Sequence, residues 1–285
     1  MRYENAVMVG ISAQELDRSV QLWAAKEASA RQVPLWICHV WEWSSIDRAV
    51  LPVADDLPAD RRSPGARIVE EAVAAIRAEV PGLEVHGALG YGRPARMLLE
   101  VSDAAGMIVV GARAEGGFPG LLVGSVSAQV AAHARCPVAV IHPGSPTAAD
   151  VVVGVDGSVQ SDRAIRIGLA EAHRTGGSLI AVHSYRCPPL PATYAPNPGV
   201  DTEAHRLAAE ELLDRALGDI ETRTDIKVQR RVVHGGPAAV LLEAATGAAV
   251  LVVGARGLGG FSGLVLGSVS QQVIRHAPCP VIVSH

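Results

Sequence analysis

The sequence contains very little lysine. Lys26 and Lys227 are the only two in 285 residues, and the formal net charge is −4 at pH 7. A net negative chain without a basic stripe is poorly suited to a polyanion, so we expect no nucleic acid partner. Many phosphate-transfer sites need a lysine to neutralise the β- and γ-phosphates, so its scarcity also argues against fast phosphoryl transfer.

Long apolar runs and closely paired cysteines are missing as well. No apolar run approaches the roughly 18 residues of a membrane helix, and no charged-then-apolar leader with a cleavage site is found. We therefore expect a cytoplasmic protein with no membrane partner. The four cysteines form no C-x-x-C pair, and Cys136 and Cys279 each precede a proline at the start of a short apolar run. Buried strand starts are expected there rather than a redox or metal site.

Glycine, in contrast, is abundant, and much of it lies in a segment that occurs twice. Residues 107–141 match residues 250–284 at a constant offset, with about two thirds of the positions identical. A period of about 140 residues indicates two copies of a whole domain rather than a solenoid. We place the first domain at 1–143 and the second at 150–285, joined by a polar, proline-containing linker.

Both halves alternate apolar strands with helical patterns. In the first half we predict strands at 6–10, 35–40, 83–89, 107–110 and 138–141, and helices at 15–30, 66–80, from Pro94, and at 125–133. In the second half we predict strands at 151–155, 178–183, 226–233, 250–253 and 281–283, and helices at 161–175, 202–220, from Pro237, and at 268–276. Asp201 is the expected N-cap of the helix at 202–220. Strands that are apolar on both faces and alternate with helices predict a parallel sheet covered by helices. The fold class is thus α/β, with two tandem doubly wound, Rossmann-like sheets of five parallel strands in the order 3-2-1-4-5.

A long glycine-dense loop joins the fourth strand of the second half to its fourth helix. The loop runs from Gly254 to Ser268, about 14 residues, where about four to six are usual. Glycine lets backbone N–H groups approach an anion without a Cβ in the way. The first amides of the following helix are unpaired and lie at the positive end of its dipole. This arrangement favours a phosphate site, with a purely structural turn as the alternative.

Ligands of open parallel sheets bind where the strand order reverses, here between the first and fourth strands. The first strand of the second half ends at 154–158, so we expect the carboxylate of Asp156 at the same mouth as Gly254. Asp156 is either a ligand contact or part of an ordinary Asp-Gly turn. Arg256 is the only nearby cation, and the loop holds no Asp, Glu or His. Amides and dipole could hold phosphates, but little is present to drive their hydrolysis, which favours binding over turnover.

The pattern Gly254-x2-Gly257-x9-Gly267-Ser268, after the strand end at 153–158, is similar to the nucleotide motif of the universal stress protein family. The chain resembles tandem-domain members of that family over nearly all of its length. The resemblance implies an ATP-binding stress-response regulatory protein that acts as a nucleotide-dependent sensor or switch. ATP, with or without Mg²⁺, would be bound by Asp156, Ser184, Gly254, Gly257, Gly267, Ser268 and Val269. Asp156 and Ser184 would lie at the adenine, Gly254 and Gly257 at the ribose and phosphates, and the last three at the phosphates.

The first half departs from this pattern. Ser12 stands where the aspartate would be, and Ala114 replaces the second loop glycine. A methyl group penalises a positive φ by about 1 kcal/mol or more. The resemblance leaves a weaker set of contacts, at Val40, Gly111, Gly124, Ser125 and Val126. We expect the second half to bind nucleotide more tightly, and the first half to bind weakly or only to complete a pseudo-dimer.

Other expectations concern partners and neighbouring segments. In the family the fifth strands pair across a dimer interface, so the resemblance implies a homo-oligomer or an internal pseudo-dimer between 138–141 and 281–283. A protein partner is expected, but the sequence does not identify it. The proline-rich stretches 41–65 and 185–200 could close over the crevices as lids.

Alternatives to the nucleotide-dependent regulator also stay open. One is a nucleotide-independent interaction or scaffold protein in which the loops are only turns. Another is a slow ATPase, although an enzyme is disfavoured by the missing lysine and base. His39 and His183 end second strands near the crevices, and we expect a structural role for both rather than a ligand or acid–base role.

Overall fold

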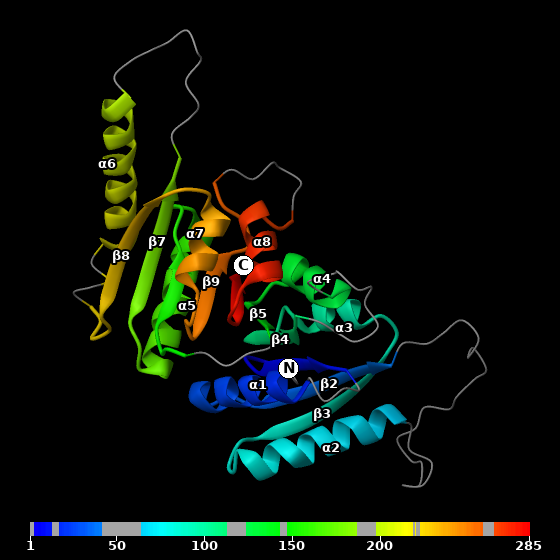
Figure 1. Cartoon of the computed structure of the whole chain (residues 1–285). Helices are drawn as coiled ribbons and strands as arrows, with labels where there is room; N and C mark the ends of the chain where they lie inside the picture. The colour runs from blue at the N-terminus through cyan, green and yellow to red at the C-terminus, as the bar shows by residue number, and fades with distance from the viewer. Residues whose placement is uncertain are drawn as a thin grey trace. The chain divides into compact units, whose positions relative to one another are not determined.

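The computed structural model describes residues 3–12, 17–41, 64–112, 124–142, 147–186, 198–218, 220, 223–258 and 265–285. The chain divides into two compact units, Met1–Pro143 and Gly144–His285. Figure 1 shows the described elements of both. Among the residues described, no helix is both long and apolar enough to cross a membrane.

The first unit is a five-stranded parallel sheet covered by helices. Its strands are β1 (Val7–Ile11), β2 (Leu35–Trp41), β3 (Val85–Tyr91), β4 (Met107–Gly111) and β5 (Val138–Ile141), in the order β3-β2-β1-β4-β5. Its helices are α1 (Asp17–Arg31), α2 (Pro64–Glu79), α3 (Pro94–Val101) and α4 (Ser125–His133).

The second unit repeats this plan. Its strands are β6 (Val151–Gly154), β7 (Leu179–Tyr185), β8 (Val228–His234), β9 (Val250–Gly254) and β10 (Val281–Ser284), all parallel, in the order β8-β7-β6-β9-β10. Its helices are α5 (Val159–Thr175), α6 (Pro198–Leu217), α7 (Pro237–Ala244) and α8 (Ser268–His276). Both orders are 3-2-1-4-5 when each unit is numbered from its own first strand, so the predicted fold class is confirmed.

Side-chain patterns explain why these segments form layers. Residues 107–110 and 250–253 are buried at every position, as expected for strands covered on both faces. The buried positions of α2 are Gly65, Val69, Ala72 and Ile76, a stripe with helical spacing. In each unit the third and fourth helices pack against each other. Right-handed crossovers place that pair on the face opposite the first two helices.

The main errors in the predicted elements concern α6. This helix begins at Pro198, three residues before Asp201, so the prediction that Asp201 is its N-cap is wrong. Its proline start matches α3 and α7, because the first turn needs no N–H from proline. The helix ends at Leu217, before the left-handed Gly218 (φ 43°), and not at 220. Most of the two stretches predicted as lids lies outside the described residues.

Candidate functional site

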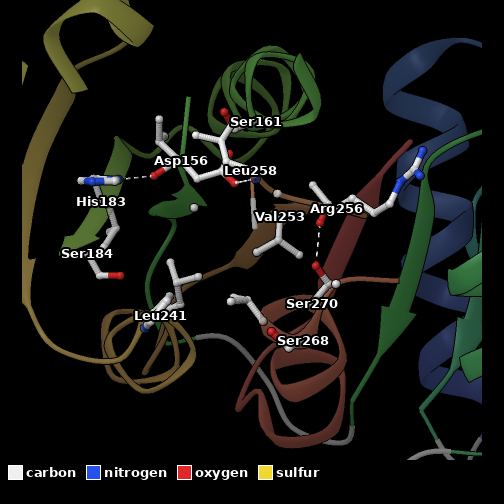
Figure 2. Close-up of a pocket in the computed structure, with 18 of the residues that line it drawn as sticks. Asp156, Ser161, His183, Ser184, Leu241, Val253, Arg256, Leu258, Ser268 and Ser270 are labelled. Carbon is white, nitrogen blue, oxygen red and sulfur yellow. Dashed lines mark hydrogen bonds between the residues drawn. The ribbon is translucent and has the colours of Figure 1, made fainter. Parts of the chain in front are cut away.

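The carboxyl ends of β6 and β9 lie side by side in the second unit, at the point where the strand order reverses. A cavity of about 610 Å³ opens there (Figure 2). It is lined by the ends of β6, β7 and β9 and by residues of all four helices of the unit, including the first turn of α8. All seven residues predicted for the second half line it: Asp156, Ser184, Gly254, Gly257, Gly267, Ser268 and Val269. The structure thus brings the seven together, and their role in nucleotide binding stays a prediction.

Asp156 links two parts of the cavity wall. Its Oδ1 accepts a hydrogen bond from the Ser158 N–H at 3.0 Å, which closes the turn after β6. Gly157 in this turn has φ 82°, a left-handed conformation that suits glycine. The Oδ2 of Asp156 accepts from the Leu258 N–H, also at 3.0 Å, across 102 positions of sequence. The carboxylate therefore takes part in an Asp-Gly turn and also fastens the start of the glycine loop.

The first turn of α8 presents main-chain donors to the cavity. Gly267, the N-cap, has φ −68° and ψ 154°, and its N–H donates to the Ala255 carbonyl at 2.8 Å. The next three amides, from Ser268 to Ser270, have no hydrogen-bond partner within the described part of the chain. The Ser270 hydroxyl donates to the Gly254 carbonyl at 2.7 Å and so ties this turn to the end of β9.

Several other amides of the loop are already used within the protein. The Ala255 N–H donates to the Ser284 carbonyl at 2.7 Å, the Gly267 N–H to Ala255, and the Leu258 N–H to Asp156. Of the glycine amides expected to face an anion, that of Gly267 is therefore already used within the protein. Residues 259–264 lie outside the described ranges. The three amides of the first turn of α8, from Ser268 to Ser270, have no partner among the residues that the structure describes.

Charges around the cavity are few. The guanidinium of Arg256 extends away from Asp156 (Figure 2).

Burial, and secondarily the positive charge of Arg256, lower the pKa of His285 to about 4. No group of three or more His, Cys, Asp or Glu side chains that could hold a metal ion occurs among the described residues.

Two histidines hold strand ends in the same way. The Nδ1 of His183 lies 2.7 Å from the Val155 carbonyl, and the Nδ1 of His39 lies 3.0 Å from the Ile11 carbonyl. A carbonyl oxygen can only accept, so both Nδ1 atoms carry the proton. Each ring therefore fastens the end of its unit's second strand to the end of the first, which supports the structural role expected for both.

The first unit contains the same frame at its predicted positions. Gly124 (φ −67°, ψ 151°) caps α4, and its N–H donates to the Ala112 carbonyl at 2.8 Å. The Ser127 hydroxyl donates to the Gly111 carbonyl at 2.5 Å, as Ser270 does to Gly254. Ser125 and Val126 begin α4, and Val40 lies near the end of β2. Ser12 follows β1 without a carboxylate, and 113–123 lies outside the described residues.

The apolar wall of the cavity is not apparent from the sequence. This wall includes Leu212 of α6, Pro237 and Leu241 of α7, and Val253 of β9. Periodicity marks such residues only as buried positions of a helix or strand, because a core contact and a ligand contact have the same hydrophobic pattern. Only the packing of the helices on the sheet shows that these residues reach the cavity.

Comparison with known proteins identifies the family. The model of the universal stress protein family matches residues 5–142 and again residues 149–285. The chain belongs to the universal stress protein family. The two matches make it a tandem member.

Full-length relatives support this assignment. A universal stress protein of Mycobacterium tuberculosis is 34% identical over 292 residues, covering 99% of this chain and 98% of the relative. One from Mycolicibacterium smegmatis is 34% identical over 292 residues, covering 98% and 97%. The crystal structure of a universal stress protein from Archaeoglobus fulgidus superposes with a TM-score of 0.69 at 23% identity, covering 99% of this chain and 96% of that one. This last likeness shows a shared fold.

Proposed function

We propose that this universal stress protein binds ATP in the cavity of its second unit and acts in a stress response as a nucleotide-dependent sensor or switch. One observation carries the proposal. A single cavity of about 610 Å³ joins the turn of Asp156 to the first turn of α8, where three amides have no partner within the described chain. Such amides, at the positive end of a helix dipole, suit a phosphate group.

The opposite end of the cavity suits a nucleobase. Leu212, Leu241 and Ser184 all line the cavity, and an apolar wall with a few polar groups is typical of small-molecule sites. The adenine would lie here, and the phosphates would extend towards Ser268. Both oxygens of Asp156 already accept main-chain N–H groups, so Mg²⁺ bound with ATP would take its ligands mainly from phosphate and water.

The site favours binding over turnover. No lysine lies in the loop, Asp156 is engaged by two amides, and the Nδ1 of His183 is engaged by a carbonyl. The first unit has the same frame without the carboxylate, so the proposal assigns tight binding to the second unit alone. We also propose a dimer, or an internal pseudo-dimer through the fifth strands. An unidentified protein partner completes the proposal.

Isothermal titration calorimetry with ATP tests the site. We expect one ATP bound per chain, and loss of binding in Ser268→Asp, because the new carboxylate takes the place of phosphate at the amides of α8. An acidic residue in the first turn stabilises a helix, so this variant should remain folded. The matched control is Leu207→Asp, which adds the same charge at an exposed site on α6. No binding by the wild type at millimolar ATP, or normal binding by Ser268→Asp, would contradict the proposal.

A second measurement separates the alternatives. Nucleotide released on denaturing the pure protein would argue against a nucleotide-independent scaffold. Turnover faster than about one ATP per minute that Asp156→Ala abolishes would favour an enzyme instead.

A further inference from the structure

We infer that Asp156 is a positioning residue that fixes the start of the glycine loop, and that Gly257 is glycine to leave room for the Asp156 carboxylate rather than for a ligand. The two residues form a pair, in which the carboxylate needs a neighbour without a side chain. The expected effect of this pair on ATP binding rests on the proposed function, whereas the contact between Asp156 and Gly257 does not.

The space around Gly257 supports this directly. A Cβ added to Gly257 would lie 2.1 Å from Oδ2 of Asp156 and 3.3 Å from its Cγ. These are the only described atoms outside its chain neighbours within 4 Å of that position. Gly257 is also absent from the described glycines with positive φ, so its backbone conformation does not require glycine. Among the described residues, Asp156 is therefore the one that leaves no space for a side chain at position 257.

The carboxylate cannot easily move aside for a methyl group. Its Oδ1 is held by the Ser158 N–H and its Oδ2 by the Leu258 N–H, each at 3.0 Å. Hydrogen bonds to an ionised acceptor are stronger than neutral ones. A side chain at 257 would therefore break the contact that joins the turn after β6 to the loop after β9.

The internal repeat gives independent support. At the two matching positions of the first half the sequence has Ser12 and Ala114. A serine side chain is shorter than that of aspartate and has no second oxygen, so it demands less space from its neighbour. Both members of the pair thus differ together between the halves, as expected if one determines the other.

The pair has a predictable effect on ligand binding. The bond between Asp156 and Leu258 sets where the loop leaves β9, and the same loop leads to the amides of α8. Loss of the carboxylate should loosen the loop start and weaken ATP binding even if the carboxylate touches no atom of the nucleotide.

A double-mutant cycle tests the inference with Gly257→Ala, Asp156→Ser and the double variant, which carries the pair found in the first half. The primary measurement is hydrogen exchange of the Leu258 amide, which needs no nucleotide. We expect exchange at least about tenfold faster in either single variant, because a bond to a charged acceptor is lost. Adding Gly257→Ala to Asp156→Ser should change the rate less than twofold. The control is Val159→Ala, a change at an exposed position close to Asp156 in sequence. In this variant the Leu258 amide should exchange at the wild-type rate.

Among variants that fold, two results would overturn the inference. One is an unchanged Leu258 exchange rate in Asp156→Ser. The other is an equal effect of Gly257→Ala in both backgrounds, since the glycine would then serve something other than the carboxylate. If Gly257→Ala alone fails to fold, recovery of folding in the double variant supports the pair, and no recovery overturns it.

ATP affinity, measured on the same four proteins, keeps the two proposals apart. Gly257→Ala should weaken binding at least about tenfold in the wild-type background and less than twofold in the Asp156→Ser background. If the wild type binds no ATP, the proposed function fails, while the exchange cycle still decides whether the pair exists.

Discussion

Replacing Ser268 with proline removes one main-chain donor from the cavity and leaves the helix intact. Ser268 is the first residue of α8, and its N–H has no partner among the described residues. Proline is tolerated at this position because its missing N–H is not used by the helix. The preceding Gly267 has φ −68° and ψ 154°, the extended conformation that a residue before proline prefers. The chain already uses this arrangement in α7, where Pro237 follows an extended Gly236.

The expected loss can be estimated from one hydrogen bond. A hydrogen bond to a charged group contributes about 1.5–3 kcal/mol, so Ser268→Pro should weaken ATP binding roughly 10- to 150-fold. Thermal stability should remain equal or rise slightly, because proline restricts the unfolded chain at a compatible position. The control is Ser268→Ala, which removes the hydroxyl and keeps the N–H, and which should bind far more tightly than the proline variant.

Calorimetric titration of the wild type, Ser268→Pro and Ser268→Ala with ATP tests this prediction. If Ser268→Pro and Ser268→Ala bind ATP equally well, main-chain donation by the first amide of α8 plays no part. If both lose binding equally, the hydroxyl is the important group. Either result would refute the reasoning that the backbone of α8 binds the phosphates.

Three further predictions concern stability and protonation. Ser158→Ala removes the N-cap oxygen that accepts the Ser161 N–H at 3.2 Å, so urea unfolding should show a loss of about 1 kcal/mol, against a few tenths for Ser158→Gly. Burial raises the pKa of Cys136 and Cys279 to about 12, so peptide mapping after thiol labelling at pH 8 should find both unmodified until the protein unfolds. The pKa of His285 is lowered to about 4, so its contribution to stability is complete above about pH 6.5 and is lost as the pH falls towards 4. An NMR titration of His285 with a midpoint near 6.5 would contradict this last prediction.

The sequence alone determined the class of fold and its duplication. Apolar strands alternating with helices identified the parallel sheets, and the repeat of 107–141 at 250–284 identified two copies. The helices at Ser125–His133 and Ser268–His276 match the prediction at both ends, because a glycine precedes each and the apolar spacing is regular. The start of α6 was misplaced because Asp201 is a favourable cap residue, but Pro198 lies upstream in a position that also starts a helix.

Only the tertiary structure decided which contacts each residue makes at the cavity. The sequence placed Asp156 and Gly257 at one mouth, but it could not show that the carboxylate accepts the Leu258 N–H or that a Cβ on Gly257 would meet it at 2.1 Å. It could not separate loop amides that are used internally from those of α8 that are not, nor find Leu212 and Leu241 in the cavity wall. Local patterns report periodicity and conformational preference along the chain. Hydrogen-bond partners and cavity walls come from residues about 30 to 100 positions apart, and only folding brings these together.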